Sequence, residues 1–212
     1  MRLLSVNIGG ARPLRIGGRN TLTAIGKAPV AGPVAVGRLG LQGDEQADPS
    51  VHGGLDKALY AYPVEHLSYW QMQYPHAPPL RGSLPPAGAD SPWGGPAANL
   101  RLFDEPLPPG FMGENLSIEG LLETEVWIGD ELHFPDCVLR VTAPREPCFK
   151  FNAVMGPNTA GRLMMERLCP GFYLAVVQPG RIDAGQPFTL VPGTRGLRVS
   201  EAFAAKRLRH QR

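Results

Sequence analysis

The stretch TEVWIGDELHFPDCVLRVTAP, residues 124–144, decides how the fold of this chain is interpreted. Short apolar runs occupy its two halves, 124–134 and 137–144, and a Pro-Asp dipeptide separates them. Two strand-like runs joined by a short turn are typical of a β-hairpin. We therefore predict a pair of antiparallel strands here and expect further strands on either side of it.

Other short apolar runs, bounded by glycine and proline, continue this pattern along the chain. They cover residues 3–8, 21–30, 34–44, 172–180 and 187–193. Helical spacing of apolar and aromatic residues is confined to about 63–74 and 158–168. Many short strands with few helices predict a mainly β fold with peripheral helices, of the α+β class, in which the sheet closes into a barrel.

The chain shows no internal repeat and no second type of composition, so we expect one domain over residues 1–192. Residues 75–110 are rich in proline and glycine and form a long insertion, either a flexible surface loop or a substrate lid. Residues 193–212 form a short helical tail that is locally basic, either a solvated helix or frayed end, or a binding arm.

Bulk composition excludes several classes of protein. The 212 residues are 43% hydrophobic and 19% charged, so the chain can bury a core, and its net charge of +2 is too small to indicate nucleic acid binding. No apolar run approaches the roughly 20 residues of a transmembrane helix, and the N-terminus resembles a first strand more than a signal peptide. We expect a cytoplasmic monomer or homodimer with no membrane partner.

The chain has three cysteines, Cys137, Cys148 and Cys169, without the spacing of a disulfide framework or a zinc site. Reduced thiols are the simplest interpretation. Cys137 and Cys169 occur in apolar surroundings that suit buried cysteines acting as small apolar residues. Cys148 does not fit that description.

Cys148 lies in the run APREPCFK, residues 143–150, where two prolines restrict the backbone on its N-terminal side. Arg145 and Lys150 flank the thiol. Nearby positive charge favours the thiolate, the form of cysteine that attacks an electrophile or binds a metal. We therefore predict that Cys148 is the reactive centre of the protein.

A second segment with chemical potential is GDEQADPSVHGGLDK, residues 43–57. Adjacent glycines, Gly53 and Gly54, permit positive φ angles and close approach of the backbone to a ligand. The N–H groups of such a loop can hold an anion, with Lys57 supplying charge and His52 nearby. A tight turn before a helix, stabilised by local aspartate hydrogen bonds, explains the same residues equally well.

The third segment is GFMGENLS, residues 110–117. Glu114 and Asn115 offer a carboxylate and a carboxamide in one short loop. A carboxamide both donates and accepts hydrogen bonds, so Asn115 is able to recognise a heterocycle. The alternative is a capped turn that precedes a strand.

Taken in this order, the three segments resemble the MOSC family, named for molybdenum cofactor sulfurase C-terminal domains, and in particular its stand-alone bacterial YiiM-like branch. The matching blocks lie at 43–66, 113–134, 143–150 and 171–180, and the likeness covers roughly residues 1–192. The resemblance implies a β-barrel core with peripheral helices. It also implies a pocket in which Cys148 binds the molybdenum of a pterin cofactor (molybdopterin), or carries a sulfur atom.

Carried over by position, the resemblance implies cofactor-binding roles for residues of all three segments: His52, Gly53, Gly54, Lys57, Glu114, Asn115, Arg145 and Lys150. The two basic residues that flank Cys148 would supply charge for the pterin phosphate. Two features depart from the branch. Only one helix is expected where its members often carry three at the C-terminus, and the proline-rich stretch around 75–98 is longer than usual.

The activity implied by the resemblance is that of a molybdenum-dependent oxidoreductase. Its substrates would be N-hydroxylated compounds, such as N-hydroxylated purine bases, which it would reduce to amines. The chain has no NAD or flavin fingerprint, so we expect a separate reductase to deliver electrons. Three alternatives remain: a sulfur carrier or transferase with a Cys148 persulfide, a non-catalytic cofactor-binding module, and a cysteine hydrolase with His52 as base.

Overall fold

The computed structural model describes residues 1–47, 53–73, 107–155 and 159–210. Its strands are β1 (Arg2–Ile8), β2 (Arg12–Ile16), β3 (Arg19–Thr23), β4 (Ala28–Pro29), β5 (Val34–Gly37), β6 (Gly40–Leu41), β7 (Leu59–Pro63), β8 (Leu116–Glu119), β9 (Glu131–His133), β10 (Val138–Pro144), β11 (Phe172–Gln178), β12 (Gly180–Ile182) and β13 (Thr189–Val191). Its α-helices are α1 (Leu67–Gln73), α2 (Phe149–Met155), α3 (Ala160–Arg167) and α4 (Val199–His210), and two 3₁₀ turns are η1 (Leu55–Lys57) and η2 (Val64–His66).

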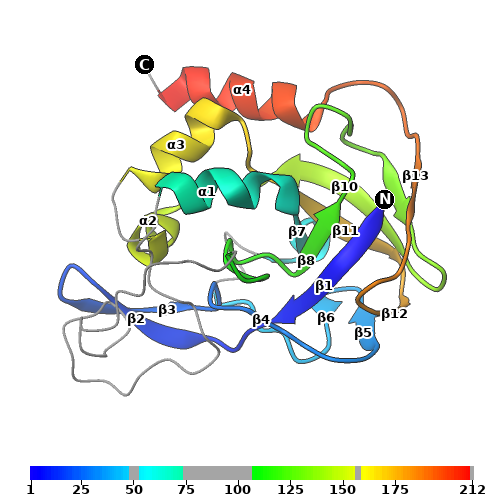
Figure 1. Ribbon diagram of the computed structural model, residues 1–212, viewed down its shortest axis with the longest axis horizontal. Coiled ribbons are helices and arrows are strands. Elements are labelled where there is room, and N and C mark those ends of the chain that lie inside the picture. The colour runs from blue at the N-terminus through cyan, green and yellow to red at the C-terminus, as the bar shows by residue number, and fades with distance from the viewer. Residues whose placement is uncertain (48–52, 74–106, 156–158, 211–212) are drawn as a thin grey trace.

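Eight of these strands form one large sheet in the order β13-β9-β10-β11-β7-β8-β1-β4 (Figure 1). The pair β7–β8 is parallel, and the other pairs of that sheet are antiparallel. Strands β12, β5 and β6 make a small second sheet, and β2 and β3 form a separate hairpin. The predicted α+β class with mainly β structure is confirmed.

The large sheet is not closed, so the predicted barrel is not confirmed. Its two ends do approach each other, because the Leu3 backbone N–H donates to the Gln186 carbonyl at 2.9 Å. The pairing there consists of one isolated bridge, between Arg2 and Pro187. Proline has no N–H to donate to a ladder, which limits how far the hydrogen bonds can continue between β1 and the segment before β13.

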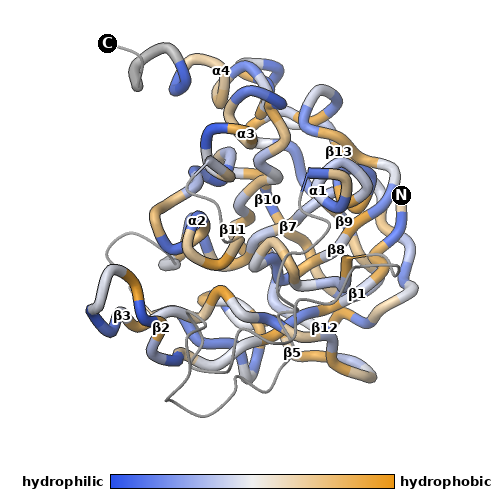
Figure 2. Tube along the Cα trace, turned by 60° about the vertical axis from the view of Figure 1, so that its left-hand side comes forward, coloured by the Kyte–Doolittle hydropathy of each residue, from blue (hydrophilic) through white to orange (hydrophobic). Residues whose placement is uncertain are grey.

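Two hydrophobic cores lie on the two faces of the large sheet, and β7 contributes to both. Its side chains alternate, with Leu59 and Ala61 in the first core and Tyr60 and Tyr62 in the second. The first core also takes in residues of the small sheet, and the second packs under the helices. Figure 2 shows apolar residues along the strands and polar residues mostly at the outer turns.

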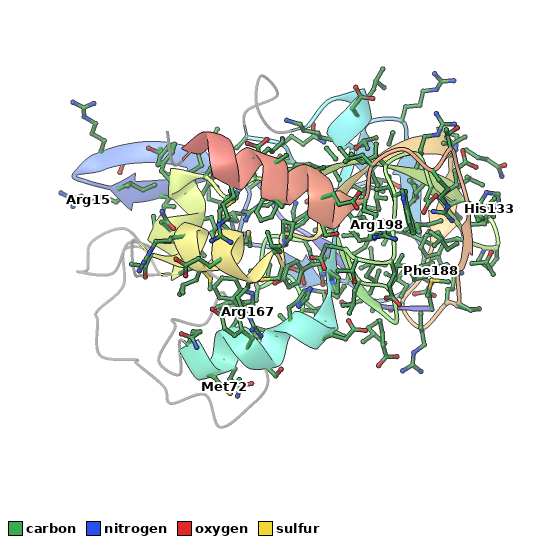
Figure 3. The ribbon with its side chains drawn as sticks, turned by 90° about the horizontal axis from the view of Figure 1, so that it is seen from above. Arg15, Met72, His133, Arg167, Phe188 and Arg198 are labelled. Carbon is green, nitrogen blue, oxygen red and sulfur yellow. The ribbon has the colours of Figure 1, made fainter. Side chains whose placement is uncertain are left out.

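The helices gather on one side of the large sheet (Figure 1). Trp70 of α1, Phe151 of α2, Met164 of α3 and Phe203 of α4 all enter the second core. In Figure 3 Arg167 of α3 points toward α1, where its guanidinium lies 4.4 Å from the ring centroid of Tyr69. The helices are therefore fixed to the sheet and to one another.

The predicted strands and helices are largely present, with differences in extent. The hairpin at 124–144 forms through β9 and β10, although only residues 131–133 of its first half are a strand. The helix predicted at about 63–74 begins later, at α1, because β7 and η2 precede it. Strand β2 and helix α2 were not predicted.

The predicted tail contains α4, which is not a frayed end. Val199 and Phe203 are both 0% exposed, one in each core. Most of the predicted insertion, residues 75–106, lies outside the described residues. The prediction that it is a surface loop or a lid is therefore not tested. No helix in the described part of the chain is both long and apolar enough to cross a membrane.

Candidate functional site

One pocket lies where the end of β3, the loop after β6, the start of β7 and the connection from β10 to α2 meet. Six of the predicted site residues line it: Gly53, Lys57, Asn115, Arg145, Cys148 and Lys150. The structure therefore brings parts of all three sequence segments together. Gly54 and Glu114 are not among the lining residues, and His52 lies outside the described part of the chain.

Cys148 lies directly before α2 and is half-buried. Its carbonyl accepts hydrogen bonds from the backbone N–H groups of Phe151, at 3.0 Å, and Asn152, at 3.3 Å. These bonds begin the helix and fix the backbone of the cysteine. The thiol therefore has a defined position at the wall of the pocket and remains accessible.

Arg145 is 4% exposed, and aromatic rings hold its side chain. The guanidinium carbon lies 4.5 Å from the ring centroid of Phe151 and 5.4 Å from that of Tyr60. Cation–π contacts of this kind stabilise a positive charge that is largely removed from water. Its backbone N–H donates to the Gly171 carbonyl at 3.4 Å, so strand pairing with β11 positions the same residue.

Two lysines of the predicted site also line the pocket with their side chains in fixed surroundings. Lys150 is buried, and its Nζ donates to the backbone carbonyl of Leu22 at 2.9 Å, which ties α2 to the β2–β3 hairpin. Lys57 Nζ lies 5.6 Å from the ring centroid of Tyr173, which is itself a lining residue. Positive charge therefore reaches the pocket from η1, β10 and α2.

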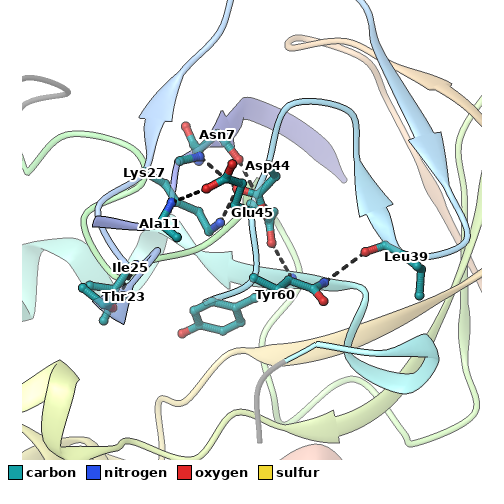
Figure 4. A network of polar contacts seen from close by, with 12 residues as sticks. Asn7, Ala11, Thr23, Ile25, Lys27, Leu39, Asp44, Glu45 and Tyr60 are labelled. Atoms are coloured by element: carbon teal, nitrogen blue, oxygen red, sulfur yellow. Dashed lines mark hydrogen bonds and ion pairs between the residues drawn. The ribbon is translucent and has the colours of Figure 1, made fainter. Parts of the chain in front are cut away.

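Lys27 adds a fourth cation that the sequence did not predict. It is 7% exposed, lines the pocket, and donates through Nζ to the carboxylate of Asp44 (Figure 4). Burial lowers the pKa of Lys27, and the charge and hydrogen bond of Asp44 oppose that change. Asp44 in turn accepts hydrogen bonds from the Gly9 N–H and from Asn115 Nδ2, each at 2.8 Å. The carboxylate of Asp44 therefore accepts hydrogen bonds from Lys27, Gly9 and Asn115.

The carboxamide of Asn115 is engaged by the protein itself. Nδ2 donates to Asp44 and, at 3.3 Å, to the carbonyl of Asn7, while Oδ1 accepts from the Tyr60 N–H at 3.1 Å. These contacts make Asn115 a support for Asp44. Recognition of a heterocycle by this side chain stays a prediction.

The carboxylate of Glu114 stabilises the loop in which it lies. Its carboxylate accepts hydrogen bonds from the Gly110 N–H and the Ser117 hydroxyl, both at 2.7 Å, and from the Met112 N–H at 3.0 Å. Burial raises the pKa of Glu114, and these hydrogen bonds oppose the rise. The alternative of a stabilised turn before a strand therefore describes what the structure shows at this position.

The loop that carries Gly53 and Gly54 has the expected positive φ angles, +105° and +79°. The φ of Gly53 is one that L side chains rarely adopt, and a Cβ there would also displace the Gln46 side chain, whose Oε1 would lie 1.9 Å away. The Gly54 N–H donates to that same oxygen at 3.3 Å. Its hydrogen bond therefore goes to the protein in the structure, and an anion-binding role for this loop stays a prediction.

Sequence reasoning missed Lys27 and gave Asp44 only a turn role. The signal was present in the run TLTAIGKAPV, residues 21–30, where a single charge interrupts an otherwise uncharged, strand-like run. A lone lysine in such a setting is seldom fully buried unless it is paired. Asp44, in the next segment along the chain, was a candidate partner.

Comparison with known proteins gives one family. The family model of the MOSC domain matches residues 48–189. Protein YiiM of Escherichia coli is 35% identical over 182 residues, which cover 86% of this chain and 70% of that protein. A protein named reductase from Gibberella moniliformis is 30% identical over 190 residues, which cover 89% of this chain and 29% of that protein.

Solved structures give the same result for the fold. The crystal structure of YiiM from Geobacillus stearothermophilus aligns over 100% of this chain and 86% of that chain, with a TM-score of 0.69 and 27% identity. A half-buried thiol, four cations and the two carboxylates of Asp44 and Glu45 line one pocket of this fold, so cations are in excess. Such a site is suited to bind an anionic ligand and to present a thiolate to it.

Proposed function

The chain belongs to the MOSC domain family, in its YiiM-like branch, and we propose that it binds a molybdenum cofactor and reduces N-hydroxylated compounds. The observation that carries this proposal is the position of Cys148, half-buried at a pocket that Lys27, Lys57, Arg145 and Lys150 also line. The family is associated with this cofactor, and the relative named reductase supports reductive chemistry.

The residues present fit such a cofactor in donor type and in charge. A thiolate is a soft ligand, which suits a metal that is also bound by dithiolene sulfur. The pterin phosphate is an anion, and buried or half-buried cations favour its binding. Cys148 would be the one metal ligand that the protein supplies. No group of three or more histidine, cysteine, aspartate or glutamate residues that could hold a metal occurs among the described residues.

When bound, the cofactor would supply the exchange of electrons with the substrate. Cys148 would hold the metal at the pocket wall, with its backbone fixed by the start of α2. Arg145 and Lys150 would hold anionic groups, and their own contacts with aromatic rings and a backbone carbonyl keep both side chains in place. Electrons would come from a separate reductase, since the sequence has no nucleotide fingerprint.

Metal analysis tests this proposal directly. The protein is purified from a host that makes the cofactor, and molybdenum per chain is measured beside a Cys148→Ser variant. We expect stoichiometric molybdenum in the parent protein and a large loss in the variant, because a hydroxyl is a far weaker ligand than a thiolate for a soft metal. Equal and near-zero molybdenum in both proteins would rule the proposal out.

A sulfur carrier is the second candidate, because the same accessible thiol could bear a persulfide. Intact-mass measurement of the purified chain separates the two. A labile extra sulfur on Cys148, without molybdenum, would identify the sulfur carrier. Molybdenum without reductase activity, with any electron donor, would identify a binding module.

A further inference from the structure

The ammonium group of Lys27 has hydrogen-bonding capacity that the described residues do not use. An ammonium has three N–H donors. Within the described residues, the hydrogen-bond partner of Lys27 Nζ is the carboxylate of Asp44. The side chain is 8% exposed and belongs to the wall of the pocket. A buried donor without a partner is unfavourable, so this position favours a ligand that brings an oxygen atom to the ammonium.

The surroundings of Lys27 hold the ammonium in place. Asp44 accepts hydrogen bonds from the Gly9 N–H and from Asn115 Nδ2, so the carboxylate that anchors the lysine is itself fixed. The buried carboxylate of Glu114 also acts on Lys27 through its charge. The other charged residues that line the pocket are Glu45, Lys57, Arg145 and Lys150.

We propose that Lys27 donates a proton to the oxygen atom that leaves an N-hydroxylated substrate, an inference that rests on the proposed function. In the balanced reaction, R–NHOH takes up two electrons and two protons and yields R–NH₂ and water. The N–O bond breaks and the electrons, supplied by the reductase, pass to nitrogen. Lys27 protonates the departing oxygen, the second proton goes to nitrogen, and solvent protons restore Lys27.

Lys27 suits this role better than Arg145, Tyr60 and Tyr173, which also line the pocket. Arg145 cannot be deprotonated in a protein. Burial raises the pKa of Tyr60 and of Tyr173, which makes both hydroxyls weaker acids. Burial has the opposite effect on Lys27, whose pKa it lowers, so the lysine gives up its proton more readily.

The test uses molybdenum-loaded protein, with reduced methyl viologen as electron donor and N-hydroxylated adenine as substrate. Lys27→Arg keeps the charge and the donors but does not release a proton. The double variant Lys27→Met/Asp44→Asn removes the pair without leaving a lone buried charge. We expect both to load molybdenum as the parent does and to lose about 100-fold or more in kcat. The kcat of the parent should fall at alkaline pH, because Lys27 loses its proton there, and this fall should be absent in both variants.

A second substrate separates proton transfer from positioning. When the leaving oxygen is acetylated, acetate departs without needing a proton, so the defect of both variants should shrink to a few-fold. Three outcomes would overturn the role of Lys27. They are a kcat of Lys27→Arg within a few-fold of the parent on the hydroxylated substrate, an equal loss of kcat on both substrates, and loss of molybdenum from the variants. A parent protein that lacks both molybdenum and activity would overturn the proposed function itself, and this inference with it.

Discussion

At the scale of single residues, the three cysteines differ most in their surroundings. Burial raises the pKa of Cys137 and of Cys169 to about 12. Both side chains lie in the hydrophobic cores, whereas Cys148 is half-buried at the pocket. The thiols of Cys137 and Cys169 therefore remain protonated at neutral pH and are poor nucleophiles.

We therefore expect iodoacetamide to alkylate Cys148 of the native protein well before Cys137 or Cys169. Peptide mass mapping after a short reaction at about pH 8, where an ordinary thiol is partly ionised, measures the order. The same reaction in urea should modify all three cysteines and serves as the control. Comparable labelling of Cys137 in the native protein would contradict the environments described.

The site also shows which residues a sequence can reveal. Cys148 and Arg145 were predictable because their neighbours along the chain carry the signal, a basic and proline-restricted run. Lys27 was not predicted, because its importance comes from Asp44, which lies 17 positions away in sequence. Glu114 was assigned to the pocket by the family resemblance, but its hydrogen bonds go to its own loop. Whether such a side chain serves the pocket depends on its hydrogen-bond partners, which a local sequence pattern does not reveal.

At the scale of elements, β7 shows why some strands escape a pattern analysis. The run LYAYP is buried along its whole length, since β8 and β11 flank it and a core covers each face. A strand buried on both faces has no polar side chains to mark its alternation. The aromatic residues that follow it have near-helical spacing, so the helix was predicted to begin too early.

Helix α4 gives a prediction at the same scale. Phe203 is 0% exposed beneath this helix, so Phe203→Ala should lower the free energy of unfolding by about 3 to 5 kcal/mol. Urea unfolding followed by circular dichroism measures the loss. Ala205→Ser, on the exposed side of the same helix, is the control and should stay within about 0.5 kcal/mol of the parent. Equal stability of the Phe203 variant and the parent would mean that α4 is a loosely attached tail.

At the scale of the whole molecule, the buried positive charges of the described residues lie at one place. Among the described residues, the buried cations are Lys27, Arg145 and Lys150, and all three line the pocket, whereas the buried carboxylates Glu114, Glu123 and Asp130 do not. Taking a charge out of water is unfavourable unless partners compensate, and an apolar core would be the more stable choice. The concentration of positive charge at the pocket is therefore better explained by ligand binding than by stability.

The pH dependence of folding tests whether these buried groups have the protonation states that burial implies. Burial raises the pKa of Glu114 above its ordinary value of 4.5. Between that value and the raised one, the folded chain keeps a proton that the unfolded chain has lost, so the free energy of unfolding falls as pH rises. The contribution is at most about 1.4 kcal/mol per pH unit.

Glu114→Gln removes this titration, although it also weakens the loop at every pH because an amide cannot accept all the hydrogen bonds of a carboxylate. The stability advantage of the parent over the variant should therefore be largest at and below pH 4.5 and should shrink as the pH rises above that value. Urea unfolding of both proteins at a series of pH values measures the difference. Parallel curves would mean that the pKa of Glu114 is not raised in the folded chain, and that its hydrogen bonds from Ser117 and the backbone fully offset burial.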